Sequence, residues 1–197
     1  MSIEYNCSHE ETVSGWDTII AKNKEKFQLL FGWTKIKEFK IEDLNKENHK
    51  LIDSNIDLEN DNDSLEDNYD FLTYNFQSII ANCILAIHIL DGVENKLEII
   101  SDNDLNNIWE KQIKINRALM IEKNKNYGSS WSIMRPEGIT DVIHTKIHRV
   151  ISLIEGEENK FESIKDSFED IINYCVFCIM KMDLMKKKGK TPPLCTP

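Results

Sequence analysis

Acidic and amide side chains recur at helical spacing near the end of the chain, in the order Glu162, Asp166, Glu169, Asp170 and Asn173. At about 100° per residue they share one side of a helix, and apolar residues take the other side. Carboxylates on one helical face repel one another unless water screens them or a cation bridges them. Oxygen ligands of this kind suit Mg²⁺ or Mn²⁺. We therefore predict a metal site formed by Glu162, Asp166 and Asp170, and the alternative is a solvated acidic face.

A second polar arc precedes this one and carries Asp141, His144, His148 and Arg149, with Lys146 at its edge. Asp141 could join the catalytic carboxylates Glu162, Asp166 and Asp170, while Lys146 and Arg149 bind phosphate oxygens. His144 and His148 at i,i+4 could also bind zinc. The sequence shows no HExxH pattern and no third ligand nearby, which favours surface histidines.

The segment KNKNYGSSWSIMRP, residues 123–136, joins these features to the preceding helix. Gly128 allows the backbone to approach a ligand closely, Tyr127 and Trp131 offer stacking surfaces, and Arg135 offers a charge. We interpret the segment as a candidate binding loop, although an ordinary helix–loop joint could have the same composition.

Apolar spacing of three and four residues predicts helices over 14–31, 71–92, 103–126, 138–156 and 160–186. No segment alternates with period two, so the predicted fold class is all-α, a helical bundle. The short link 155–160 predicts that the last two helices pair antiparallel, with Asp141, Arg149, Glu162 and Asp170 facing a shared cleft. Cys175 and Cys178 lie in the apolar part of the last helix and are predicted to be buried small side chains.

The stretch 53–70 contains eight acids, four asparagines and no base. This composition predicts a solvated insertion. A calcium loop fits poorly, because Asn62 and Asn68 stand where that loop needs Gly and Glu.

An internal repeat is indicated by FQSIIANCILAIHIL (76–90), which aligns without gaps on FEDIINYCVFCIMKM (168–182). Ile20 with Lys22–Asn23–Lys24 likewise echoes Ile121 with 123–125, and HKLI (49–52) faintly echoes HRVI (148–151). We predict two tandem, diverged repeats: 14–93, which contains the acidic insertion, and 103–187, which carries the candidate site, followed by a tail over 188–197. Chance similarity between Ile-rich helices is the alternative.

Charge and composition limit the partners. Residues 1–100 carry 20 acids and 9 bases, and the chain lacks the basic stripe that duplex nucleic acid requires. Its apolar runs are too short to cross a membrane, and five cysteines form no disulfide pattern, which together predict a cytoplasmic protein. The sequence also allows a homodimer.

The elements KNKNYGSSW, RP, ITD, KIHR and DIINY together resemble the family called nucleotide modification associated domain 1. Its members show N-x-D-Y-G-x-x-W, then T-D before K-x-x-R, and then an acidic helix with D-x-x-N-Y. The resemblance covers about 107–183. It implies a helical protein from phage or bacterial nucleotide-modification neighbourhoods, and more distantly it is similar to MazG-like all-α nucleoside triphosphate pyrophosphatases, which bind Mg²⁺. Asn126 replaces the family acid before Tyr-Gly, and the ExxE…ExxD signature of MazG enzymes is absent.

The family positions here are Asn124, Tyr127, Gly128, Trp131, Thr140, Asp141, Lys146, Arg149, Glu162, Asp170, Asn173 and Tyr174. The residues predicted to bind substrate are Lys123, Asn124, Tyr127, Gly128, Trp131, Arg135, Lys146, Arg149 and Asn173. The resemblance implies a Mg²⁺-dependent hydrolase of a nucleotide phosphoanhydride, with a nucleotide or modified nucleotide as partner. The alternative is a non-catalytic helical protein that binds a nucleotide or another protein.

Overall fold

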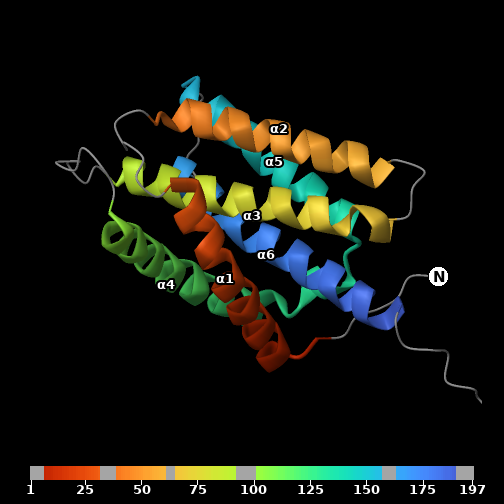
Figure 1. Cartoon of the computed structure of the whole chain (residues 1–197). Coiled ribbons are helices and arrows are strands. Elements are labelled where there is room, and N and C mark those ends of the chain that lie inside the picture. Colours follow the sequence, from red (N-terminus) through yellow and green to blue (C-terminus); the bar gives the residue numbers. More distant parts are fainter. Residues whose placement is uncertain (1–6, 32–38, 61–64, 92–100, 157–162, 190–197) are drawn as a thin grey trace, which may run out of the picture.

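The computed structural model describes residues 7–31, 39–60, 65–91, 101–156 and 163–189. The described residues form helices and no strand, which confirms the all-α prediction (Figure 1). The elements are α1 (His9–Phe31), α2 (Ile41–Asn60), α3 (Leu65–Leu90), α4 (Asp102–Tyr127), the short 3-10 helix η2 (Ser130–Ile133), α5 (Pro136–Ile154) and α6 (Ile164–Gly189).

The predicted helix starts have clear local causes. Ser101 and Asp104 form a capping box at α4: the Ser101 hydroxyl accepts the amide of Asp104, and the Asp104 carboxylate accepts the amide of Ser101, both at 3.2 Å. Pro136 occupies the first turn of α5, where its missing N–H is of no consequence, so this helix begins two residues before the predicted position. Helix α6 continues to Gly189, beyond the predicted end at 186.

The helices predicted from the sequence did not include α2. The stretch expected to be a solvated insertion is helical in α2 up to Asn60 and again in α3 from Leu65, with residues 61–64 outside the described ranges. Apolar periodicity missed α2 because its buried stripe contains only two aliphatic side chains. The buried positions are Leu44, Asn45, Asn48, Ile52 and Asn55.

Amide hydrogen bonds take the place of apolar packing along this stripe. Asn48 accepts from Asn82 at 2.9 Å, Asn55 accepts from Asn75 at 2.8 Å, and Asn45 donates to the carbonyl of Ile147 at 3.3 Å. Buried amides are tolerated when they are hydrogen-bonded. The bonds attach α2 to α3 on one side and to α5 on the other.

The helices form three layers, each of two helices (Figure 1). Helices α2 and α5 make one outer layer, α1 and α4 the other, and α3 with α6 lie between them. The core contains large apolar side chains from both halves of the chain, among them Trp16, Phe27, Phe76 and Phe168, all without solvent exposure. Cys175 and Cys178 are free thiols buried in this core, as predicted.

Side-chain contacts give the direction of each pair. Lys165 bonds Asp91 and Lys186 bonds Asp70, so α3 and α6 run antiparallel. The contacts of α1 with α4 and of α2 with α5 likewise join the start of one helix to the end of the other, so these two pairs are also antiparallel. Each helix of the first half therefore lies against the helix at the same place in the second half. Two repeats packed face to face would give such a pairing of helices, and the tandem origin itself stays a prediction.

Helices α5 and α6 pair antiparallel, as predicted from their short connection. The Cys178 thiol lies 3.8 Å from the carbonyl of Pro136 at one end, and Lys146 bonds Asp170 further along.

Residues 68–90 of α3 are long and apolar enough to cross a membrane by length and composition. Most of this segment is buried against α1, α2 and α6, as expected for a core helix of a bundle.

Candidate functional site

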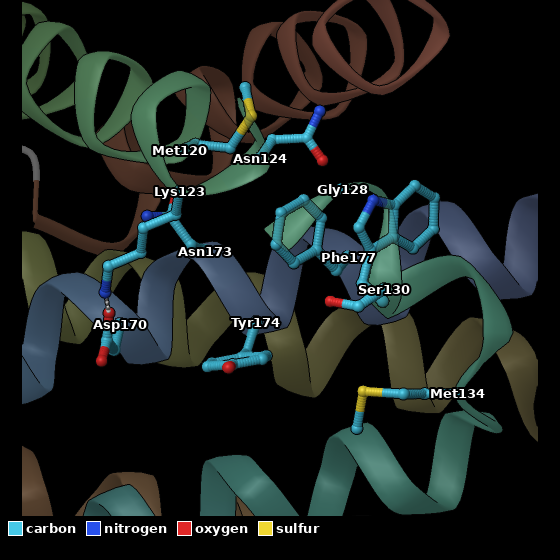
Figure 2. Close-up of a pocket in the computed structure, with 11 residues that line it drawn as sticks. Met120, Lys123, Asn124, Gly128, Ser130, Met134, Asp170, Asn173, Tyr174 and Phe177 are labelled. Carbon is cyan, nitrogen blue, oxygen red and sulfur yellow. Dashed lines mark hydrogen bonds and ion pairs between the residues drawn. The ribbon is translucent and has the colours of Figure 1, made fainter. Parts of the chain in front are cut away.

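A cavity of about 480 Å³ opens where the end of α4, η2 and one face of α6 meet (Figure 2). This volume lies within the range of small-molecule sites. The lining residues are Met120, Lys123, Asn124, Gly128, Ser130, Trp131, Met134, Asp170, Asn173, Tyr174 and Phe177. The cavity therefore gathers Lys123, Asn124, Gly128, Trp131, Asp170 and Asn173 from the predicted site.

Helix α6 supplies one continuous wall. Asp170, Asn173, Tyr174 and Phe177 follow the spacing i, i+3, i+4, i+7, so one helical face presents all four. Figure 2 shows Asp170 toward one end of this wall and Met134, which precedes α5, at the other.

The opposite wall depends on Gly128. Its φ of 62° and ψ of −167° are accessible to glycine and strained for other residues, and this conformation ends α4 and directs the chain into η2. The Lys181 ammonium, which is buried, donates to the carbonyl of Ser132, and the hydroxyls of Thr12 and Ser129 lie 3.1 Å apart. These bonds hold η2 against α6 and α1.

The apolar end of the cavity is aromatic. Trp131 stacks on Phe177 with ring centroids 5.1 Å apart and an angle of 4° between the planes, and Tyr174 meets Phe177 edge-on at 6.3 Å. Phe177 covers one face of the indole, and Trp131 as a whole is only 3% exposed. Tyr174 and Phe177 are the half-buried rings that a planar ligand can contact.

The polar end of the cavity is an ionic cluster. Asp170 forms ion pairs with Lys123 from α4 and with Lys146 from α5, the latter at 2.9 Å. Figure 2 shows Lys123 extending from α4 toward Asp170. These three side chains together carry one net positive charge, and Asp166 one turn away on α6 interacts with Lys123 as well.

Two amides lie between the ends. The Trp16 indole donates to Oδ1 of Asn173 at 3.1 Å, which orients the amide. The Nδ2 group of Asn173 is buried and has no hydrogen-bond partner among the described residues. Nδ2 of Asn124 lies 2.8 Å from Nδ1 of His9. Asn173 therefore keeps an unused donor beside the cavity.

The carboxylates predicted to bind Mg²⁺ have different surroundings. Asp170 is paired with two lysines, as described above. Asp166 accepts the backbone amide and the hydroxyl of Ser163 at 2.9 and 2.8 Å, and these bonds hold its pKa below the usual value. Glu162 lies outside the described residues. The Mg²⁺ or Mn²⁺ site therefore stays a prediction.

Asp141 does not line the cavity with Asp170. It is exposed on α5 and adds to the negative potential at Glu59 of α2, and the neighbouring Thr140 hydroxyl donates to Glu59 at 2.6 Å. The T-D element thus faces α2, because α5 packs against α2 as well as α6. Arg135 is exposed and Arg149 half-buried, and both lie outside the cavity lining. The side chain of Tyr127 lies outside the described part of the structure.

Sequence reasoning missed Phe177, Met120, Met134 and Ser130 as lining residues. Phe177 could have been found, because it lies one turn beyond Tyr174 and two turns beyond Asp170 on the same helical face.

A comparison with known protein families finds a match in the part of the chain that lines the cavity. The family model described as Nucleotide modification associated domain 1 matches residues 123–182, which confirms the resemblance for that segment. All lining residues of the cavity except Met120 lie within the match. No curated protein and no solved structure matches the chain.

Proposed function

We propose that this nucleotide-modification-associated segment binds a nucleotide in the cavity between α4, η2 and α6. The observation that carries the proposal is the combination of aromatic rings at one end of the cavity with Lys123 and Asp170 at the other, where Asp170 also pairs with Lys146 just outside the lining. A nucleotide has the same polarity, with a planar base at one end and phosphate at the other.

The base contacts Tyr174 and Phe177 in this proposal. Aromatic side chains provide large contact areas for planar ligands, and base stacking of this kind contributes about 1–3 kcal/mol per base. The unpaired Nδ2 donor of Asn173 suits a carbonyl oxygen on the base, because a buried donor gains a bond that it otherwise lacks.

The phosphate contacts Lys123 and Lys146. In the free protein Asp170 holds both ammonium groups at the cavity. A phosphate carries more charge and more acceptor oxygens than one carboxylate, and it can therefore compete for the lysines. In this arrangement the phosphate displaces Asp170 as the partner of the two cations.

A more specific proposal is that the site also hydrolyses a phosphoanhydride with the help of a metal ion. It is supported by Asp166, one helical turn from Asp170, and it requires Asp170 to exchange a lysine for Mg²⁺. Binding without hydrolysis is favoured by the ion pairs that already occupy Asp170. Product analysis with and without Mg²⁺ separates the two.

Titration calorimetry with a panel of nucleosides and nucleotides tests binding. We expect nucleotides to bind more tightly than the matching nucleosides. Lys123→Met should weaken nucleotide binding by about 10- to 100-fold, because a hydrogen bond to a charged group contributes about 1.5–3 kcal/mol. Nucleoside binding should change little.

Lys125→Met is the matched control, since Lys125 is an exposed lysine on the same helix outside the cavity lining. Equal effects of the two substitutions, or no preference for phosphorylated ligands, would contradict the proposed phosphate site.

Asp170→Asn distinguishes a lysine site from a metal site. Without Mg²⁺, we expect nucleotide affinity to rise about fivefold, because removing a carboxylate near the phosphate removes a repulsion of roughly 1 kcal/mol. If Asp170 instead acts by binding Mg²⁺, the substitution abolishes any Mg²⁺-dependent turnover. Weaker nucleotide binding in the presence of EDTA would contradict the role given to the two lysines.

A further inference from the structure

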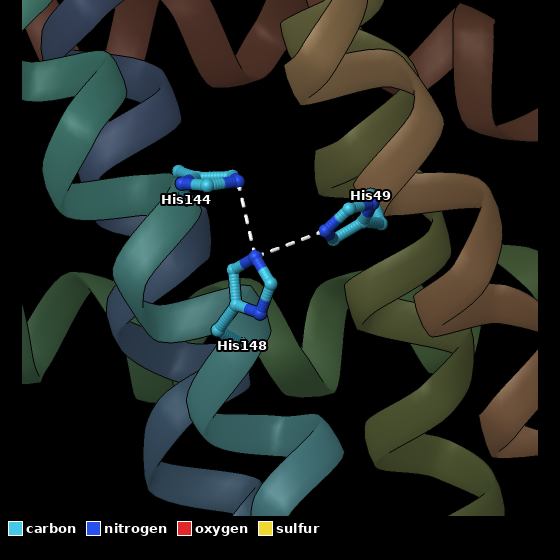
Figure 3. A group of neighbouring side chains, drawn as sticks. All are labelled: His49, His144 and His148. Atoms are coloured by element: carbon cyan, nitrogen blue, oxygen red, sulfur yellow. Dashed lines mark hydrogen bonds between the residues drawn. The ribbon is translucent and has the colours of Figure 1, made fainter.

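Three histidines from two helices converge on one point (Figure 3). His49 lies on α2, and His144 and His148 lie one turn apart on α5. Nε2 of His148 is 3.0 Å from Nε2 of His49 and 3.1 Å from Nε2 of His144, and one ligand atom from each ring lies within 4.8 Å of the others. The sequence shows no third ligand near His144 and His148, which favours ordinary surface histidines. The fold places a third histidine beside them.

Asp53 completes the group from α2. One of its oxygens lies 3.0 Å from Nδ1 of His49, and the other lies 3.5 Å from Nε2 of His144. A carboxylate that accepts the Nδ1 proton of a histidine fixes the tautomer in which Nε2 carries a lone pair. His49 thus offers a basic Nε2 toward the other two rings.

Hydrogen bonding alone satisfies this arrangement poorly. Nε2 of His148 has at most one proton, yet it faces a ring nitrogen on each side. A tetrahedral ion bound at about 2.0–2.1 Å separates its nitrogen ligands by about 3.3 Å. The distances of 3.0 and 3.1 Å from Nε2 of His148 to the other two rings are close to this value. The three rings belong to two helices that are already packed together, so little rearrangement is needed to close the site.

We propose that His49, His144 and His148 bind a Zn²⁺ ion through their Nε2 atoms, that Asp53 orients His49, and that the ion fastens α2 to α5. Imidazole is a preferred ligand of zinc, and three histidines with water in the fourth position are an established coordination set. His148 is exposed and His49 and His144 are half-buried, which leaves an open side for entry of the ion and for the fourth ligand.

The surroundings of His148 disfavour its charged form. Partial burial, followed by the proximity of His144 and His49, lowers the pKa of His148, and Asp53 opposes this shift.

The zinc site is separate from the nucleotide cavity. Lys146, which reaches Asp170 at the cavity, lies about 160° around α5 from both His144 and His148. No histidine of the cluster lines the cavity. His49 and His148 also occupy equivalent positions in the repeat alignment, so the ion would join the two halves of the chain where like helices meet.

Metal binding is tested on the full chain after removal of metal with a chelator. We expect one Zn²⁺ per chain by calorimetry, and Co²⁺ in its place should give the intense visible bands of a four-coordinate ion. Zinc should raise the melting temperature of the wild-type protein. His49→Gln should abolish the Co²⁺ bands and this thermal shift, and Asp53→Asn should weaken binding about 10- to 100-fold.

His88→Gln removes a histidine outside the cluster and should bind zinc like the wild type, as should Cys7→Ser, which removes a partly exposed thiol. Circular dichroism in EDTA establishes that His49→Gln is folded, and the exposed His148→Gln serves as a second variant. Absence of Zn²⁺ binding by the wild type, or wild-type affinity in both cluster variants, would overturn the proposal. Loss of nucleotide binding in the tests above leaves the zinc site unaffected.

Discussion

Phe76→Ala and Phe168→Ala should each lower the free energy of unfolding by about 3–5 kcal/mol, because each substitution leaves a large cavity in the core. Both rings are completely buried, on α3 and α6 respectively, where the central layer contacts its neighbours. Urea denaturation followed by circular dichroism measures the loss. Similar losses are expected because the two residues occupy equivalent positions of the proposed repeat.

Phe71→Ala is the matched control. Phe71 lies on the same helix as Phe76 and is 68% exposed, so its removal should change stability by no more than about 0.5 kcal/mol. A small loss at Phe76 or Phe168, or a comparable loss at Phe71, would show that the central layer is not the packed core described above.

Helix positions could largely be predicted from the sequence because most buried stripes are aliphatic or aromatic. The stripe of α6 contains Phe168, Ile171, Ile172, Cys175 and Ile179, and its 3.6-residue period is plain. The stripe of α2 uses Asn45, Asn48 and Asn55 instead. A hydrophobic pattern cannot recognise a buried asparagine, since its burial depends on partners such as Asn82 that lie on another helix.

The binding loop could also be predicted, because its chemistry is local. Lys123, Asn124, Gly128 and Trp131 lie within nine residues, so the turn at Gly128 brings them together whatever the rest of the fold does. Asn173 joins them because α6 forms the facing wall.

Long-range pairings could not be predicted in the same way. A helical wheel identifies Asp170 as a surface carboxylate, but the choice between a metal and a lysine depends on Lys123 and Lys146, which arrive from two other helices. For the same reason the place of His49 in the histidine cluster could not be predicted. It is 99 residues from His148 in sequence, and their Nε2 atoms are 3.0 Å apart in the structure.

The stability of the protein should depend on pH through the ionisation of Glu59. Its carboxylate is mostly buried where α2 meets α5, and burial raises its pKa from 4.5 to about 7. The hydrogen bond from Thr140 lowers this pKa, and the nearby charges of Glu137 and Asp141 raise it. The Thr140 hydroxyl has one proton and also lies 3.2 Å from the carbonyl of Pro136. A protonated Glu59 can donate to the Thr140 hydroxyl, which then donates to the carbonyl of Pro136.

Stability should therefore fall as the pH rises through this interval. Below pH 4.5 Glu59 is protonated in both states and contributes no pH dependence. Between pH 4.5 and 7 the unfolded chain releases the proton while the folded chain retains it, so the folded state loses stability with increasing pH. The shift corresponds to a total loss of roughly 3 kcal/mol by pH 8.

Glu59→Gln keeps the shape of the side chain and removes the titration. We expect the variant and the wild type to have similar free energies of unfolding near pH 4.5 and the variant to be more stable by up to about 3 kcal/mol at pH 8. The comparison at each pH cancels the other titrating groups, which are common to both proteins. Asp57→Asn, which removes an exposed carboxylate from the same helix, is the matched control for the loss of a charge from α2. A difference between Glu59→Gln and the wild type that is the same at both pH values would mean that Glu59 titrates normally and that the contact between α2 and α5 leaves its carboxylate hydrated.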